Sequence, residues 1–293
     1  MTSILTWNIQ CGLGVDGQVD LNRISEIIKN FGDADIICLQ EVARFEPELD
    51  NGVGADQFSE LAALFPDHHP VYGPALDRWY NGDNQRRQFG NMVLSRLPII
   101  QVFNHLLPQP TPPTPCKHMQ RQALEVVVNL SDGPLRITTT HLEYHCEEQR
   151  LAQAEHLREI QSEVSSNSSY NLTAPDFGLY SAVARPERGI ICGDFNALVD
   201  DDVYRLLTAG SKSNESSGYK PSVYKDAWRI KHEQRPHAPT CGIYDPEQWP
   251  EGPHCRDFIF LTRELSPLVK DVQVQEETNA SDHQPVLMLL ETD

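Results

Sequence analysis

Eight short apolar runs, spread from residue 4 to residue 290, constrain the fold of this chain more than any other feature. Several are rich in β-branched residues and are bounded by turn residues, which is the pattern of β-strands. The runs are Ile4–Asn8, Ala34–Gln40, Gly90–Ser95, Ala123–Val128, Leu135–Thr140, Gly189–Cys192, Phe258–Leu261 and Pro285–Leu290. They predict β-sheet along the whole chain.

Helical patterns lie between some of these runs. Asp20 suits the N-cap of a helix over Leu21–Phe31, and apolar residues recur at helical spacing in Glu147–Val164. Gln57–Phe65 indicates a shorter helix. Strands outnumber helices and do not alternate strictly with them, a pattern that fits an α/β (α+β) chain with two sheets packed face to face, each covered by helices, but does not by itself establish that arrangement. Segments 105–115, 165–175 and 210–217 are rich in Pro, or in Ser and Asn, and are predicted to be loops.

Length and composition fit one domain. The chain has 293 residues, of which 39% are hydrophobic and 23% charged, so a packed core is expected. We expect a single domain over residues 1–293 and a monomer. No run approaches the roughly 20 apolar residues of a membrane helix, and the N-terminus lacks the pattern of a signal peptide. We therefore expect a cytoplasmic protein with no membrane partner.

The net charge and the cysteine content limit which ligands and cross-links we expect for this chain. A formal net charge of −18 opposes the binding of long nucleic acids, which proteins usually hold with many cationic side chains. A small phosphate ester remains possible where cations gather in one cleft. The seven cysteines include no CxxC pair, and we expect no disulfides because the chain looks cytosolic. A zinc site made by Cys241, His254, Cys255 and His237 is a weaker alternative.

Polar residues stand at the ends of the predicted strands, where a rigid scaffold presents reactive groups. Their carboxylate and amide oxygens suit a hard cation such as Mg²⁺ or Mn²⁺, and their histidines suit proton transfer or hydrogen bonding to a phosphoryl oxygen. Hydrolysis of a phosphate ester needs both kinds of group. The residues are Asn8, Glu41, His141, Asp194, Asn196, Asp257, Asp282 and His283.

Each of these positions also has a plainer interpretation. The stretch Gly193-Asp194-Phe195-Asn196 has the composition of a turn after a strand. A Glu or His at a strand end is commonly a solvated or half-buried residue. The joint occurrence of all these positions in one chain favours a site.

The sequence resembles the endonuclease/exonuclease/phosphatase family, the DNase I-like superfamily of metal-dependent phosphoesterases. The matching segments are "TWNIQ", "LQE", "FGNMVLSR", "THLEYH", "GDFN", "RDFIFL" and "SDHQPV", which run from residue 6 to residue 286. The resemblance implies a four-layer αββα sandwich of two mixed sheets flanked by helices. It also implies an active site at one edge of the sheets.

The resemblance further implies a role for each polar position. His283 matches the histidine that contacts the scissile phosphate, and Asp257 the carboxylate that orients it. His141 matches a second histidine that stabilises the phosphate or protonates the leaving group. Asp194 matches the residue that orients or deprotonates the attacking water, and Asn196 a donor to the phosphate or that water. The implied ligands for one or two Mg²⁺ or Mn²⁺ ions are Asn8, Glu41, Asp194, Asn196 and Asp282. The carboxylate that orients His141 is not identified.

The substrate has to be inferred from other residues. Arg86, Arg87 and Arg121 lie next to predicted strands and are candidates for substrate contacts, as is Asn91 of "FGNMVLSR". The alternative for the arginines is a solvated charge. We expect a small phosphodiester or phosphomonoester as the substrate. A nuclease acting on DNA or RNA is the alternative enzyme, and a catalytically silent binding protein of the same fold is the alternative of another class.

Overall fold

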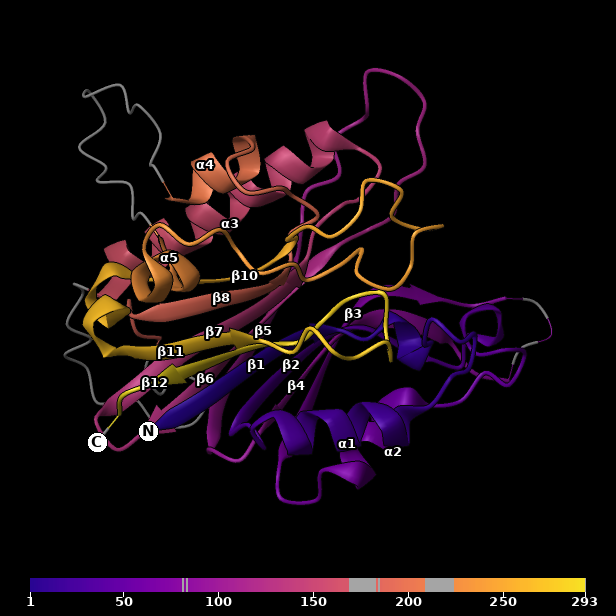
Figure 1. Ribbon diagram of the computed structural model, residues 1–293, viewed down its shortest axis with the longest axis horizontal. Helices are drawn as coiled ribbons and strands as arrows, with labels where there is room; N and C mark the ends of the chain where they lie inside the picture. Colours follow the sequence, from indigo (N-terminus) through magenta and orange to yellow (C-terminus); the bar gives the residue numbers. More distant parts are fainter. Residues whose placement is uncertain (81, 83, 169–182, 184, 209–223, 293) are drawn as a thin grey trace.

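Two six-stranded β-sheets form the centre of the molecule (Figure 1). The computed structural model describes all residues except 81, 83, 169–182, 184, 209–223 and 293. The first sheet contains β1 (Thr2–Asn8), β2 (Ile36–Arg44), β3 (His69–Arg78), β4 (Arg87–Ser95), β11 (Val269–Val274) and β12 (Val286–Leu290). The second contains β5 (Ile99–Leu106), β6 (Gln122–Leu130), β7 (Gly133–His141), β8 (Gly189–Asp194), β9 (Lys225–Asp226) and β10 (Asp257–Leu261).

Both sheets are mixed. Their strand orders are β11-β12-β1-β2-β4-β3 and β5-β6-β7-β8-β10-β9. One parallel pair lies inside each sheet, β1 with β2 and β7 with β8, and the other pairs are antiparallel. The described α-helices are α1 (Leu21–Phe31), α2 (Gln57–Leu64), α3 (Glu147–Ser168), α4 (Asp202–Thr208) and α5 (Ala227–His232). Helices α1 and α2 lie below the first sheet in Figure 1, whereas α3 and α4 lie above the second. The expected αββα sandwich is confirmed.

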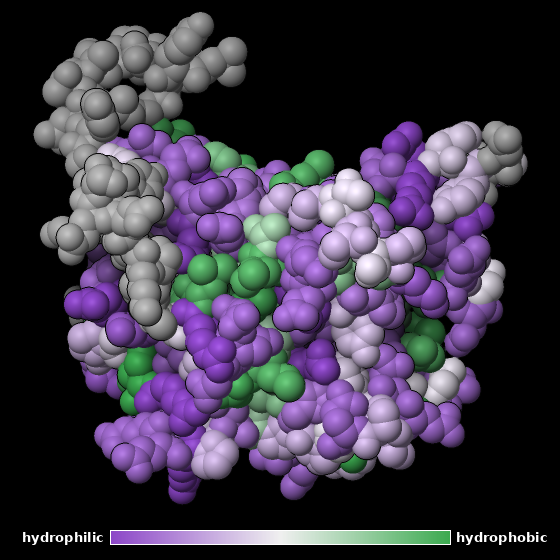
Figure 2. Space-filling view, turned by 90° about the horizontal axis from the view of Figure 1, so that it is seen from above, coloured by the Kyte–Doolittle hydropathy of each residue, from purple (hydrophilic) through white to green (hydrophobic). Residues whose placement is uncertain are grey.

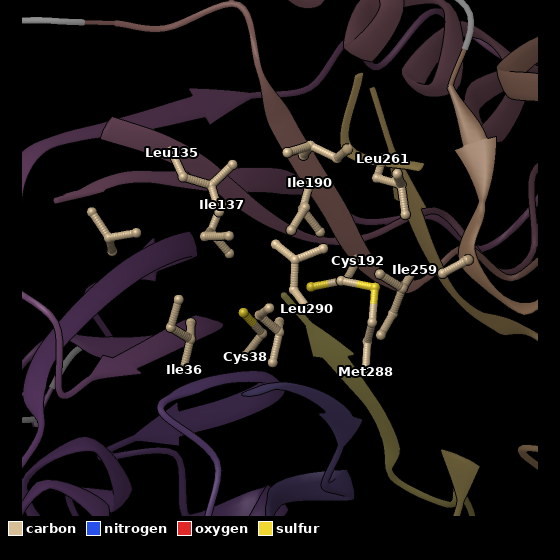
Figure 3. Packing of buried hydrophobic residues seen from close by; sticks show 14 of the residues in the cluster. Ile36, Cys38, Leu135, Ile137, Ile190, Cys192, Ile259, Leu261, Met288 and Leu290 are labelled. Atoms are coloured by element: carbon tan, nitrogen blue, oxygen red, sulfur yellow. The ribbon is translucent and has the colours of Figure 1, made fainter. Parts of the chain in front are cut away.

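The main core lies between the two sheets and follows the two-residue period of the strands. In β1, Ile4 points into the cluster shared with the second sheet, whereas Leu5 and Trp7 pack on the side of α1. Figure 3 shows how apolar side chains from both sheets, among them Cys38 and Cys192, meet in this layer. A third cluster lies between the second sheet and α3 with α4.

The predicted elements are present, and their ends have identifiable causes. Each of the eight apolar runs overlaps a strand, with Ala34, Asp35 and Pro285 just outside, and the three predicted helices form. Helix α1 begins where expected because the Asp20 carboxylate accepts a hydrogen bond from the backbone N–H of Arg23 at 3.1 Å. Helix α3 is longer than predicted and ends at Ser168.

The strands that the sequence did not predict are β3, β5, β9 and β11, and each lies at an edge of its sheet. An edge strand has a neighbouring strand on one side only, and its other side faces solvent. It therefore needs fewer apolar residues and tolerates proline. Strand β5 alternates half-buried and exposed residues, and β3 contains Pro70 and Pro74. Helices α4 and α5 were also not predicted. They have only seven and six residues, which is too short for apolar residues to show a helical period. The first predicted loop begins after Leu106 rather than at residue 105, and residues 169–175 and 210–217 lie outside the described residues.

The helical face above the second sheet is mainly hydrophilic, with a few apolar residues between the polar ones (Figure 2). This is the pattern of a helical layer with one buried and one solvent-facing side. Among the described residues, no helix has the length and apolar content that a membrane crossing requires.

Candidate active site

The strand period brings four of the predicted side chains together. In each strand the residues that fill the layer between the sheets alternate with those that face the helices, and Asn8, His141, Asp194 and Asp257 continue the inner series at the strand ends. The register places Asp194 between His141 on one side and Asp257 on the other. The amide Nδ2 of Asn8 donates to Oδ2 of Asp194 at 3.1 Å, which joins the two sheets at this end.

Glu41 reaches the same place through a break in its strand. The pairing of β2 with β4 shifts between Leu39 and Val42, and Glu41 has a φ of 59°. A bulge of this kind turns a side chain away from the face that strict alternation would give it. By alternation Glu41 would lie on the helix side with Leu39; instead its Oε1 accepts a hydrogen bond from Asn8 Nδ2 at 3.0 Å. The uncommon backbone conformation is therefore located at a predicted metal ligand.

Gly193 is required by the close packing of two neighbouring strands and not by a turn. It belongs to β8, has a φ of 136°, and a Cβ atom there would lie 1.9 Å from the carbonyl oxygen of Thr140. The close approach of β7 to β8 explains this glycine. The turn itself follows at Asn196, which has a φ of 48°, and Phe195 is buried in the cluster beneath α3.

His283 and Asp257 form a buried pair. Nδ1 of His283 lies 2.8 Å from Oδ2 of Asp257, and the Thr240 hydroxyl donates to the same oxygen at 2.6 Å. Burial opposes charging of His283, but the negative charges of Asp257, Asp194 and Asp282 outweigh it and hold its pKa well above the ordinary value. His283 is therefore a cation at neutral pH. Thr240 was missed in the sequence because nothing in its neighbourhood marks it.

His141 has the opposite character. Burial and the positive charge of Arg121 lower its pKa to about 3, so its ring is neutral. Nδ2 of Asn196 donates to the Leu142 carbonyl at 2.9 Å and is therefore also the donor in its 3.0 Å contact with Nε2 of His141. The proton of His141 consequently lies on Nδ1, which has no hydrogen-bond partner among the described residues and is 3.8 Å from Oε1 of Glu41. No carboxylate of the described chain orients His141 by a hydrogen bond at that atom.

The carboxylates of the site fit a divalent cation. Burial and the charge of Asp282 raise the pKa of Glu41 to about 7, and burial raises that of Asp282. A bound cation would relieve both effects, and the oxygens of Asn8, Glu41 and Asp282 are the ligands that Mg²⁺ and Mn²⁺ prefer. Asp194, Asp257 and His283 also offer ligand atoms within 4.8 Å of one another. In that group His283 already pairs with Asp257, which leaves it less suited to an ion than the Glu41 side.

These residues surround a cavity of about 360 Å³. Its wall includes Trp249, whose indole N–H donates to Oδ2 of Asp282 at 3.2 Å, and Tyr144, whose ring packs edge-on against that of Trp249. Arg121 and Glu143 complete one side as an ion pair. Of the predicted site residues, the cavity is lined by Asn8, Glu41, Arg121, His141, Asp194, Asn196, Asp282 and His283, with Asp257 directly behind His283.

Three predicted substrate contacts lie elsewhere. Arg86 is exposed and pairs with Asp77, and Arg87 pairs with Glu46 and stacks over Tyr80. Asn91 is buried, and its amide donates to the Gln122 carbonyl. None of the three lines the cavity, and each has the other partner just described. A substrate contact by any of the three stays a prediction that this cavity does not support.

The weaker zinc alternative is not supported in the described chain. His237 is bound to Asp226 at 2.6 Å, and His254 contacts Arg256 at 2.7 Å. These residues do not form a group of ligand atoms around one point, whereas the cluster at His283 does.

The fold is shared with several solved structures. An endonuclease/exonuclease/phosphatase from Bacteroides vulgatus is 19% identical with a TM-score of 0.68, the match covering 100% of this chain and 99% of that one. A mannosyl-6-phosphatase from Bacteroides thetaiotaomicron is 18% identical with a TM-score of 0.67, over 99% and 100%. The human Nocturnin catalytic domain is 19% identical with a TM-score of 0.62, over 100% and 93%. At these identities the likeness is one of fold.

Sequence comparison adds the family. No curated protein matches the chain. The sequence model of the endonuclease/exonuclease/phosphatase family matches residues 5–283, a span that contains all of the strand ends described above. The protein therefore belongs to the endonuclease/exonuclease/phosphatase family.

Proposed function

We propose that this protein is a metal-dependent hydrolase of small phosphate esters and that residues 1–293 act as one domain and as a monomer. The observation that carries the proposal is the composition of the cavity. Crowded carboxylates, Glu41 and Asp282, lie beside the cationic groups of His283 and Arg121. Such a site can bind a divalent cation and a phosphate together. The cation would neutralise the carboxylates, and the phosphate would neutralise the cationic side chains.

Asn8, Glu41 and Asp282 would hold Mg²⁺ or Mn²⁺. When bound, the ion would polarise a phosphoryl oxygen and neutralise its charge. Both carboxylate oxygens of Asp194 already accept hydrogen bonds. Oδ1 accepts one from the backbone N–H of Asn196 at 2.8 Å, and Oδ2 accepts one from Nδ2 of Asn8. We assign Asp194 to the attacking water rather than to the ion, since its carboxylate lies between the two histidines.

The remaining residues would bind and orient the phosphoryl group. His283, kept cationic by Asp257, would donate from Nε2 to a phosphoryl oxygen. Neutral His141 would donate from Nδ1, on the side of Glu41, to an oxygen of the substrate. Asn196 holds His141 in that tautomer. Burial opposes ionisation of Asp194, but the positive charge of His283 and hydrogen bonds from Asn196 and Asn8 outweigh it and lower the pKa, so Asp194 is ionised and able to accept a proton from water.

Several observations favour a small substrate. The cavity volume of about 360 Å³ suits a small organic phosphate, and the net charge of −18 opposes long nucleic acids. One structural neighbour is a mannosyl-6-phosphatase. A nuclease is the second candidate of the same chemistry. A silent binding protein would have lost part of the site, whereas every expected ligand position is filled.

A phosphoester panel tests the proposal. Purified protein is assayed with p-nitrophenyl phosphate, bis-p-nitrophenyl phosphate, sugar phosphates and plasmid DNA at physiological salt. We expect turnover of small esters that stops in EDTA and returns with Mg²⁺ or Mn²⁺. Undiminished turnover in the chelator would reject the metal, rapid plasmid cleavage would favour the nuclease, and no turnover of any ester would favour the silent protein.

A further inference from the structure

The Arg121 side chain is unusual among the arginines of this chain because it is buried against the cavity. Only 6% of Arg121 is exposed, yet it lines the cavity beside the catalytic groups. Its Nη1 atom is buried and has no hydrogen-bond partner in the part of the chain that the structure describes. A buried guanidinium N–H without an acceptor is costly, so an acceptor supplied by a ligand would stabilise this side chain.

The backbone fixes Arg121 at this place. Its carbonyl accepts the N–H of Leu107 at 2.9 Å, which extends the β5–β6 ladder by one step. On the next strand, the N–H of Leu142 donates to the Asp194 carbonyl at 2.9 Å. Arg121 therefore lies in the same row of strand ends as the catalytic groups.

Glu143 holds the guanidinium from the other side. Its Oε2 lies 3.4 Å from Nε of Arg121 and accepts the N–H of Met119 at 3.1 Å, while its Oε1 accepts the N–H of His145 at 2.9 Å. Glu143 is itself 1% exposed, and its own N–H donates to Gln153 of α3. The contact with Glu143 uses Nε, and Nη1 stays without a partner among the described residues.

We propose that Glu143 positions Arg121 to bind the third non-bridging oxygen of a terminal phosphate, so that the enzyme prefers phosphomonoesters to phosphodiesters. This inference rests on the proposed function. A monoester has three free phosphoryl oxygens and close to two negative charges, whereas a second ester group masks one oxygen and removes one charge. The metal side at Glu41 and the His283 side each take an oxygen, and Arg121 takes the remaining one.

A matched pair of substrates isolates this contact. p-Nitrophenyl phosphate and methyl p-nitrophenyl phosphate share a leaving group and differ in one masked oxygen. The quantity measured is the ratio of kcat/KM for the monoester to kcat/KM for the diester. A hydrogen bond to a charged group contributes roughly tenfold or more in binding, so Arg121→Gln should lower this ratio about tenfold.

Further variants separate positioning from folding. Glu143→Gln should lower the ratio in the same direction but less, and Arg121→Lys should recover part of it. Arg188→Gln removes an ion pair with Asp132 beside the turn at the far end of β7 and should leave the ratio unchanged. If Glu143 were merely structural, its variant would slow both substrates equally and leave the ratio as it is.

A binding measurement gives a readout without turnover. Phenylphosphonate and its monomethyl ester are titrated calorimetrically with Mg²⁺ present, and we expect tighter binding of the phosphonate in the wild type and loss of that preference in Arg121→Gln. Equal binding of the two ligands by the wild type, or an unchanged ratio in Arg121→Gln, would overturn the inference alone. Failure of the wild type to hydrolyse either p-nitrophenyl ester would instead overturn the proposed function.

Discussion

Nδ1 of His283 lies 2.8 Å from Oδ2 of Asp257, although the two residues belong to segments of different sheets. Asp257 begins β10 of the second sheet, and His283 precedes β12 of the first. The pair therefore depends on the packing of the sandwich, and in the proposed mechanism it keeps the histidine charged and oriented.

We expect the two residues to act as one unit. His283→Ala and Asp257→Asn should each lower kcat by roughly 100-fold, because each removes the positioned cation. The double variant should be hardly slower than the worse single variant. Steady-state kinetics of the four proteins measures the coupling. Full activity in Asp257→Asn, or strictly additive losses, would reject the pairing.

Gly193→Ala should destabilise the fold by at least about 3 kcal/mol, because the new Cβ would overlap the Thr140 carbonyl between two central strands. Gly17→Ala is the matched control. Gly17 also has a positive φ, of 75°, but a Cβ there meets nothing within 4 Å. Urea unfolding followed by tryptophan fluorescence compares the two. Equal losses of stability would show that the backbone conformation matters and the close strand approach does not.

Glu125 provides a pH-dependent part of the stability away from the cavity. Burial opposes its ionisation, but hydrogen bonds from His105 and Arg185 and the charge of Arg136 outweigh burial and lower its pKa to about 2 from a usual 4.5. The folded form thus binds the proton less tightly than the unfolded form. The stabilisation is complete above the unfolded pKa and is lost as the pH falls from about 5 toward 2.

Glu125→Gln should accordingly lower the free energy of unfolding by about 3 kcal/mol at pH 7, and the difference from the wild type should shrink as the pH falls. Urea midpoints at several pH values measure this. Asp202→Asn, which removes an exposed ion pair with Arg205, should have little effect at any pH. A difference for Glu125→Gln that stays constant with pH would contradict the assigned pKa.

The sequence predicted the strands at the centre of each sheet better than those at its edges. Buried strands need apolar residues on both faces, so β1, β2 and β8 have clear patterns. Edge strands such as β3 and β5 need fewer, and their patterns resemble those of loops. The strand pattern was compatible with two sheets and the family resemblance implied them, whereas the edge strands were not predicted.

For the site, strand ends were a reliable guide where the strand is regular. Asn8, His141 and Asp194 lie where alternation puts them. The bulge that turns Glu41 into the cavity has no sequence signal, and neither has the contact of Thr240 with Asp257, since both depend on long-range packing. Arg86 and Arg87 show the limit of proximity in sequence: they adjoin the segment "FGNMVLSR" but do not line the cavity.

Glu41→Gln tests the central claim most directly. Without its carboxylate the cavity should lose the cation, and kcat/KM for the preferred ester should fall by roughly 100-fold or more. The melting temperature in EDTA should not fall, because the pKa of this half-buried carboxyl is raised to about 7 and its ionisation opposes folding near neutral pH. Glu60→Gln, which removes a negative charge from the exposed part of α2, is the control and should keep full activity. A folded Glu41→Gln protein that hydrolyses the ester at the wild-type rate would contradict the account.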